Sequence, residues 1–273
     1  MSPAEHEERL REIGAAQDET MPLAEAALRL AALDHPGREV EPYLRHLDDL
    51  AAPLAGKVVP AAADRADALS SMIHIDHGYG GDRETYDDMV NADLMAVIDR
   101  RKGLPVALAI LYIETARRAG WPAWGLDFPG HFVFRLDGEA DRVILDPFHA
   151  GVTVEPPALR QLLKTYVGPE AELEPKYYEP MPDRAILLRL LNNIRGRALQ
   201  GGKAERGLQI MRRMLLIAPA EPQLWLESAA IQMQSGQLKG AREAAEACLA
   251  LAPEAAMKQQ AEKLLATLRR DLN

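Results

Sequence analysis

The segment Leu104–Ile113 is a run of ten residues that would be apolar on every face of a helix. A membrane-spanning helix needs about 20 such residues, so this run is too short to cross a bilayer. It predicts a helix buried at the centre of a domain, which other elements must cover on all sides. Pro105 suits the first helical turn, because the amide hydrogen that proline lacks has no partner there. Arg117 and Gly120 suit the last turn and the cap.

The elements around this helix are indicated by the spacing of apolar residues. A helical period predicts helices over Leu23–Leu33, Val40–Leu54 and Asn91–Arg101. After Gly120 the period changes to two, which predicts the strands Ala123–Asp127, His131–Leu136 and Val143–Asp146. A central helix on a small antiparallel sheet, with further helices before it, is an α+β fold.

The C-terminal part contains an internal repeat. Ile217–Pro219 recurs 34 residues later as Leu251–Pro253, within sequence of helical period. The large, small, small and helix-ending positions of the second repeat are held by Trp225, Ala229, Ala241 and Pro253. This pattern resembles the tetratricopeptide repeat, a pair of antiparallel helices, and predicts an all-α region that closes with a helix over Met257–Leu272.

Such repeats usually hold extended peptides in a groove lined by their first helices. In this register the residues facing the groove are Asn192, Gln223, Met233 and Gln234. An Asn side chain there can bond a peptide backbone through its donors and its acceptor. Two interpretations stay open, a true peptide groove and a helical brace that covers the N-terminal domain. A protein or peptide partner is expected.

The stretch 175–183, PKYYEPMPD, separates mixed sequence from helical sequence and predicts a domain boundary. The predicted domains are 1–180, a mixed domain with N-terminal helices, and 181–273, the helical repeats. Residues 1–180 carry 18 Lys/Arg against 32 Asp/Glu, and residues 181–273 carry 14 against 9. Neither part is basic enough for a duplex-binding surface, so no nucleic-acid partner is expected.

The compartment is indicated by composition. A single cysteine excludes a disulfide framework and favours a reducing environment. The N-terminus is acidic and is not followed by an apolar stretch, so no secretory signal is expected. We therefore expect a cytoplasmic protein without membrane contact.

The residues with the clearest chemical potential are His131 and Asp146. His131 would start one strand and Asp146 would end the next, so a hairpin can place them side by side, with the carboxylate accepting the Nδ1–H of the ring. One interpretation is a buried hydrogen bond that tethers two strands. The other is a pocket at the start of the central helix, lined by Pro105, His131 and Asp146, that captures a carboxylate, an amide or a peptide end.

No metal or cofactor is expected. His131, Asp146 and His149 can be drawn as a cluster, but no set of four ligands has the spacing of a known metal site.

Two polar positions near the central helix have structural expectations. Asn91 is expected to cap the helix that follows it. Arg100 or Arg101 is expected to pair with a carboxylate such as Asp127 or Asp146.

Six stretches of the chain carry a family pattern, in order and at natural spacing: LAEAAL (23–28), YLRHLDDLA (43–51), NADLMAVIDRRKGLPVALAILYIETARRAG (91–120), PGHFVFR (129–135), ILDPFHAG (144–151) and RLLNNI (189–194). Together they resemble the SirB1 family, in which a transglutaminase-like domain precedes tetratricopeptide-type helices. The resemblance implies a papain-like core, a buried helix packed on an antiparallel sheet.

The resemblance also implies where an active site would lie. In catalytic members of the wider superfamily a cysteine begins the central helix, and a His–Asp pair sits on two strands of the sheet. His131 and Asp146 match that pair, but the position of the cysteine falls at or beside Pro105, where no nucleophile stands. The only cysteine, Cys248, lies in the repeats at a position expected to be packed.

The sequence therefore predicts a non-catalytic protein-binding or regulatory protein with a degenerate transglutaminase-like domain. The alternative is an amide-bond hydrolase or acyltransferase that uses His131 as base and Asp146 to orient it, with water or a substrate group as nucleophile.

Overall fold

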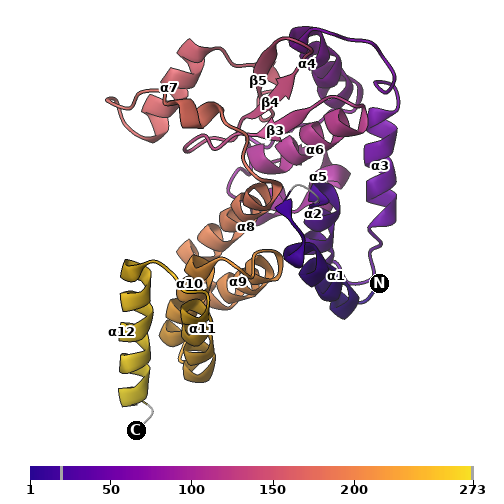
Figure 1. The fold of residues 1–273 in the computed structure, drawn as a ribbon. Coiled ribbons are helices and arrows are strands. Elements are labelled where there is room, and N and C mark those ends of the chain that lie inside the picture. The colour runs from indigo at the N-terminus through magenta and orange to yellow at the C-terminus, as the bar shows by residue number, and fades with distance from the viewer. Residues whose placement is uncertain (19–20, 272–273) are drawn as a thin grey trace. The chain divides into compact units, whose positions relative to one another are not determined.

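The structure is a computed structural model that describes residues 1–18 and 21–271 (Figure 1). The chain forms two compact units. The first unit comprises residues 1–6 and 17–190, and the second comprises residues 7–16 and 191–273. The boundaries between the units therefore fall inside two helices, α1 (Pro3–Ala15) and α8 (Asp183–Gln200). The predicted domains 1–180 and 181–273 stay a prediction.

The first unit is built around helix α6 (Pro105–Arg118), as the apolar run predicts. Pro105 takes the first helical position, and every residue from Pro105 to Ile113 is buried. The other helices of this unit include α2 (Leu23–Ala32), α3 (Glu41–Ala51), α4 (Ala62–Ser70), α5 (Leu94–Arg100), α7 (Pro156–Tyr166) and the first part of α8 (Asp183–Gln200). Helices α2, α3, α4 and α5 all contact α6, so the apolar helix is covered as required.

Two short sheets complete the first unit. The larger is antiparallel in the order β3 (Ala123–Gly125), β4 (Phe134–Asp137), β5 (Arg142–Asp146), β6 (Val152–Thr153). The smaller pairs β1 (Gly80–Gly81) with β2 (Lys102–Gly103) in parallel. Strands β3 and β4 contact α6, which confirms the expected α+β fold (Figure 1).

Two details of the sequence expectation are wrong. His131 does not start a strand, because β4 begins only at Phe134 and the preceding residues form a loop. Asn91 does not cap α5, since it lies in a short 3-10 helix, Met89–Ala92. Asp93 is the cap instead, and its carboxylate accepts the Ala96 N–H at 2.9 Å.

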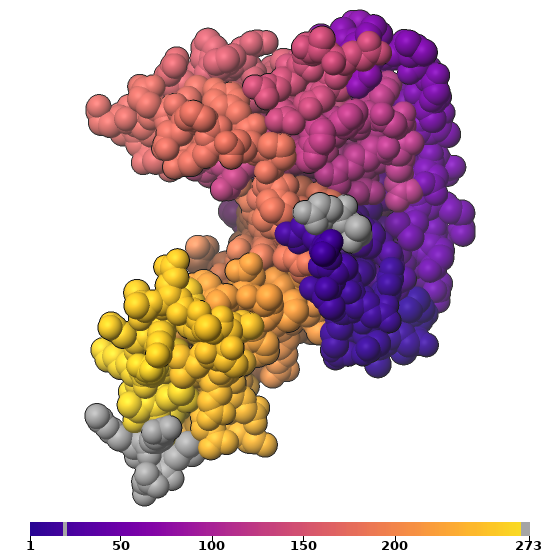
Figure 2. Space-filling view, viewed as in Figure 1, coloured from indigo at the N-terminus to yellow at the C-terminus, as the bar shows by residue number. Residues whose placement is uncertain are grey.

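The second unit is helical and consists of most of α1 (Pro3–Ala15), the end of α8, α9 (Ala204–Ile217), α10 (Pro222–Gln234), α11 (Leu238–Ala250) and α12 (Ala255–Asp271). Helices α8 to α11 lie in the orange part of the surface in Figure 2, and α12 lies in the yellow part. The small residues Ala229 on α10 and Ala241 on α11 are both fully buried, as the repeat pattern predicts. Helix α1 approaches α9 so closely that a Cβ at Gly14 would collide with the carbonyl oxygen of Leu216.

Within the described residues, no helix combines the length and apolarity that a bilayer crossing requires.

Candidate functional site

His131 lies in the loop between β3 and β4, and Arg189 of α8 fixes that loop. The His131 carbonyl oxygen accepts a hydrogen bond from Arg189 Nη2 at 2.8 Å, and the same nitrogen donates to Phe128 O at 2.7 Å. The guanidinium carbon of Arg189 also lies 5.1 Å from the centre of the Phe132 ring. Reasoning from the sequence missed this positioning role. The only available signal was the place of Arg189 in the stretch RLLNNI.

Asp146 is the last residue of β5, and its carboxylate is the hydrogen-bond centre of the turn that follows. Oδ1 accepts the backbone N–H groups of Phe148 and His149 at 2.9 and 3.2 Å. Oδ2 lies 2.8 Å from His131 Nε2 and 2.8 Å from His149 Nδ1. The structure brings His131 and Asp146 together and adds His149 as a second imidazole on the same oxygen.

The His131 nitrogen that faces Asp146 is Nε2, not the expected Nδ1. The expectation assumed that the side chain leaves from a strand position beside Asp146. Because His131 instead lies in the loop before β4, its ring reaches the carboxylate with the outer nitrogen.

The His131–Asp146 pair is buried, with 6% and 3% of the two residues exposed. Burial raises the pKa of the Asp146 carboxyl, but the hydrogen bonds and charges of His131 and His149 outweigh it and bring the pKa below its ordinary value. Asp146 is therefore ionised at neutral pH and can accept all four hydrogen bonds. The His149 side chain is 46% exposed, so this ring joins the buried carboxylate to solvent.

Tyr166 covers one face of the His131 ring. The two rings are stacked, with centres 6.0 Å apart and planes 12° from parallel. Tyr166 is the last residue of α7, which is anchored because its leucines pack in an apolar cluster with Phe128. Gly130 has a φ of +73° and lies directly against Tyr166, so no larger residue fits between the loop and this ring.

The start of α6 and the Asp146 turn are both bonded to β1. The Gly81 N–H donates to Phe148 O at 3.2 Å, and the Asp82 N–H donates to Gly103 O at 3.2 Å, two residues before Pro105. A Cβ on Gly81 would lie 2.5 Å from the Phe148 ring, so glycine permits this close approach. The turn after Asp146 and the segment before α6 are thus hydrogen-bonded to two adjacent residues, Gly81 and Asp82.

The position at which the family resemblance implies a nucleophile is occupied by Pro105. Both Pro105 and its N-cap Leu104 are buried, and neither carries a thiol, hydroxyl or amine. Cys248 is fully buried in α11 of the second unit, where burial raises the pKa of its thiol.

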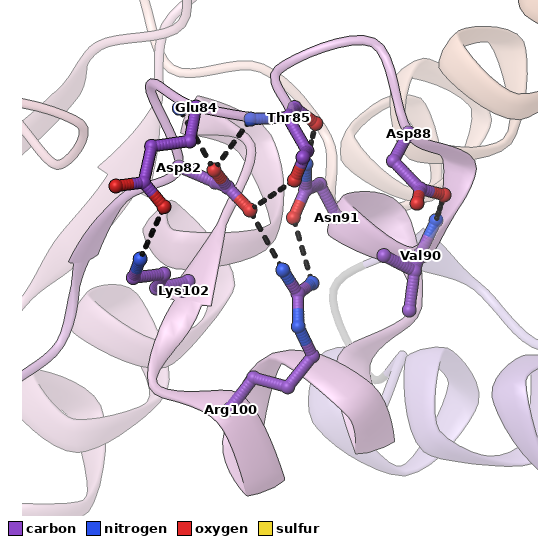
Figure 3. A network of polar contacts seen from close by, with 8 residues as sticks. All are labelled: Asp82, Glu84, Thr85, Asp88, Val90, Asn91, Arg100 and Lys102. Carbon is purple, nitrogen blue, oxygen red and sulfur yellow. Dashed lines mark hydrogen bonds and ion pairs between the residues drawn. The ribbon is translucent and has the colours of Figure 1, made fainter.

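A second polar cluster fixes the loop between β1 and α5 (Figure 3). The buried Asp82 carboxylate accepts the Thr85 N–H at 2.9 Å, the Thr85 hydroxyl at 2.7 Å and Arg100 Nη2 at 2.7 Å. Arg100 Nη1 also donates to Asn91 Oδ1 at 2.8 Å, and Asn91 Nδ2 donates to Thr85 O at 2.6 Å. Backbone hydrogen bonding by Thr85, together with the Arg100 charge, holds the pKa of Asp82 far below its ordinary value.

Arg100 pairs with a carboxylate, as expected, but the partner is Asp82 and not Asp127 or Asp146. Arg101, in a left-handed conformation with φ 59°, contacts the Tyr79 hydroxyl and His46 instead. The loop that carries Asp82 has no regular period of apolar residues, so the sequence does not predict that Asp82 meets Arg100 of α5.

The predicted partner-binding residues are placed differently from one another. Asn192 on α8 and both Gln223 and Gln234 on α10 are exposed, whereas Met233 is half-buried. Gln223 and Gln234 are eleven residues apart, close to three helical turns, and share one face of α10.

An ion pair between Arg195 and Glu227 links α8 to α10. Gln223 Nε2 donates to Glu227 Oε1 at 2.9 Å, so this predicted residue belongs to the same polar bridge. Arg195 stands where the repeat pattern requires a small residue. Its length is accommodated because the side chain reaches out to the neighbouring repeat.

A cavity of about 520 Å³ lies beside Trp225 in the second unit. Its wall includes Arg11 of α1, Arg212 of α9, Gln232 of α10 and Glu243 of α11. None of the four predicted partner-binding residues lines it. The sequence did not indicate this cavity, because one wall is a helix from the opposite end of the chain.

Comparison with known proteins places these observations in a family. The model of the transglutaminase-like superfamily matches residues 41–192, and a tetratricopeptide repeat model matches residues 194–266. The first match covers more than half of the chain and includes His131 and Asp146. No solved structure matches the chain.

Similar full-length proteins occur in bacteria. A UPF0162 protein of Xylella fastidiosa is 30% identical over 230 residues, which cover 82% of this chain and 82% of the relative. A UPF0162 protein of Pseudomonas aeruginosa is 32% identical, covering 72% of each chain. Protein SirB1 of Salmonella typhimurium is 22% identical over 197 residues, again 72% of each chain.

Proposed function

Because the chain belongs to the transglutaminase-like superfamily and carries tetratricopeptide repeats behind that domain, we propose that it binds a protein partner and does not catalyse acyl transfer. Repeats of this type commonly mediate protein interactions. The observation that carries the proposal is the buried proline at the first position of α6. Acyl transfer through a covalent intermediate needs a nucleophile beside the imidazole, and Pro105 has no atom that can attack a carbonyl.

The partner would bind the second unit as an extended peptide. Asn192 and Gln223 are exposed and offer amide donors and acceptors for a peptide backbone. The cavity beside Trp225 would accept an apolar side chain of the same peptide. In this proposal the ranges 1–180 and 181–273 are separate domains, and the second binds the partner. The protein acts in the cytoplasm, which the single buried cysteine favours.

A second function is supported by one observation, the hydrogen bond between His131 Nε2 and the ionised Asp146. This bond orients the ring as a general base is oriented, so an amide-bond hydrolase with water as nucleophile is the alternative. The proposal of binding without catalysis expects the wild-type protein and the variant His131→Ala to leave acyl and amide substrates equally intact. Faster turnover by the wild type would favour the alternative.

The binding proposal is tested with the full-length protein as bait in a lysate of the source cells. Partners identified by mass are purified, and their affinity is measured directly for the wild type and for the double variant Asn192→Ala, Gln223→Ala. Two lost hydrogen bonds should weaken binding by about 10-fold or more. Lys239→Ala is the matched control, since Lys239 is exposed but outside the proposed groove.

The variant Arg212→Glu tests the cavity beside Trp225 independently. Equal affinity for the wild type, the double variant and Arg212→Glu would contradict the proposed binding surface.

A further inference from the structure

The cluster His131, Asp146 and His149 has the composition of a metal site. Each residue offers one ligand atom, and the three atoms all lie within 4.8 Å of one another. His131 Nε2 and His149 Nδ1 both face Asp146 Oδ2. Two imidazole nitrogens and one carboxylate oxygen are ligands that first-row divalent ions accept, whereas Mg²⁺ and Ca²⁺ prefer oxygen alone. We propose that these three residues bind a divalent transition-metal ion, with Zn²⁺ as the best fit. The proposal goes beyond partner binding and does not depend on it.

The geometry is close to that of an occupied site. Zinc ligands lie about 2.0–2.2 Å from the ion, so in tetrahedral geometry two ligand atoms are about 3.3–3.5 Å apart. The two histidine nitrogens each lie 2.8 Å from Asp146 Oδ2. Each ring therefore needs to withdraw from the carboxylate by only a fraction of an ångström. On binding, each ring carries its hydrogen on the nitrogen that faces away from the ion.

The ligands are held in place by their own neighbours, as outer-shell partners hold them in metal sites. Asp146 Oδ1 is fixed by two backbone N–H groups, which leaves Oδ2 to face the ion. The His131 loop is fixed by Arg189 through two carbonyl oxygens, and the ring itself is stacked on Tyr166. Ligation would therefore cost little conformational entropy.

Charge and access also favour a cation. Residues 1–180 carry an excess of 14 acidic over basic side chains, which attracts cations. His149 is 46% exposed, so an ion can reach the buried carboxylate from its side. Three protein ligands leave at least one coordination position for water, the arrangement of open rather than closed zinc sites.

The test uses the full-length protein prepared without a histidine tag and stripped with a chelator. It is titrated with Co²⁺, whose visible absorption reports tetrahedral binding, and then with Zn²⁺ in competition. One equivalent of Co²⁺ should bind and be displaced by Zn²⁺ but not by Mg²⁺. His149→Ala and Asp146→Asn should each weaken binding by more than about 100-fold, the upper end of the loss seen for outer-shell partners.

His77→Ala is the matched control, because it also removes an imidazole that lies beside another, His46, with ring centres 6.0 Å apart, but outside the proposed site. It should bind as the wild type does. Circular dichroism of the metal-free proteins establishes whether the variants are folded. If Asp146→Asn is unfolded, the metal affinity of His149→Ala alone tests the proposal. The proposal is overturned by an absence of saturable binding, by His149→Ala retaining wild-type affinity, or by His77→Ala losing the ion.

Discussion

Two buried carboxylates of the first unit, Asp82 and Asp146, are stabilised in the same way. Asp82 directly follows β1, and Asp146 is the last residue of β5. Each carboxylate accepts two backbone N–H groups from the turn immediately after it. The remaining acceptor capacity is used by side chains, Thr85 and Arg100 for Asp82 and two histidines for Asp146. Such a carboxylate fixes a turn and also leaves a charge inside the protein, which only its partners compensate.

Replacing Asp82 by Asn should destabilise the first unit by about 1.5–3 kcal/mol, because charged hydrogen bonds are lost and Arg100 is left without its partner. Urea unfolding at neutral pH measures this change. Glu84→Gln is the control, since the Glu84 side chain is 82% exposed and its ion pair with Lys102 contributes less than about 1 kcal/mol. Equal losses in both variants would show that the network in Figure 3 has no special stabilising role.

The contribution of Asp82 to the free energy of unfolding should decrease at acidic pH. Its folded pKa lies below the ordinary value of 3.8. A lowered folded pKa adds stability above the unfolded pKa, and this is lost as the pH falls through the folded value. The difference in unfolding free energy between wild type and Asp82→Asn should therefore be constant from pH 7 to about 5 and shrink below about pH 4. A difference that grows on acidification would contradict this assignment.

At the scale of elements, β1 controls how closely the Asp146 turn approaches α6. Gly81→Ala should destabilise the protein by about 1–3 kcal/mol, because the new methyl group overlaps the Phe148 ring. Gly196→Ala is the matched substitution in α8, where a Cβ meets no atom within 4 Å. It should stabilise by about 0.5–1 kcal/mol through the helix propensity of alanine. Thermal unfolding of the two variants should therefore shift in opposite directions, and a shift of the same sign would refute the steric argument.

Element type was easier to predict than element ends. The apolar run and the change of period after Gly120 identify α6 and the sheet, because burial imposes these patterns on the sequence. The beginning of β4 was placed too early because Phe132 continues the alternation of Phe134 and Leu136 while lying in the loop. The start of α5 depends on which acidic or amide side chain turns back to the helix, and both Asn91 and Asp93 are suitable types.

At the scale of the whole molecule, the two compact units should unfold separately. Trp121 and Trp124 belong to the first unit and Trp225 to the second. A variant Trp225→Phe then reports only the first unit, and a double variant Trp121→Phe, Trp124→Phe reports only the second. Their urea transitions, followed by fluorescence, should have different midpoints, because each unit has an apolar cluster of its own. Coincident transitions in both variants, matched by circular dichroism, would show a single cooperative unit.

The sequence by itself determined the fold class, the buried helix and the helical repeats, because the period of apolar residues and the spacing of small residues can be seen directly in the order of amino acids. It also identified His131 and Asp146 as residues that can meet. Only the tertiary structure decided that His149 shares the same carboxylate oxygen, that Arg189 holds the His131 loop and that α1 walls the cavity beside Trp225. These contacts join residues in loops or in segments that are distant along the chain. A periodic pattern indicates the type of an element and its buried face, but not which residues of another segment will pack against it.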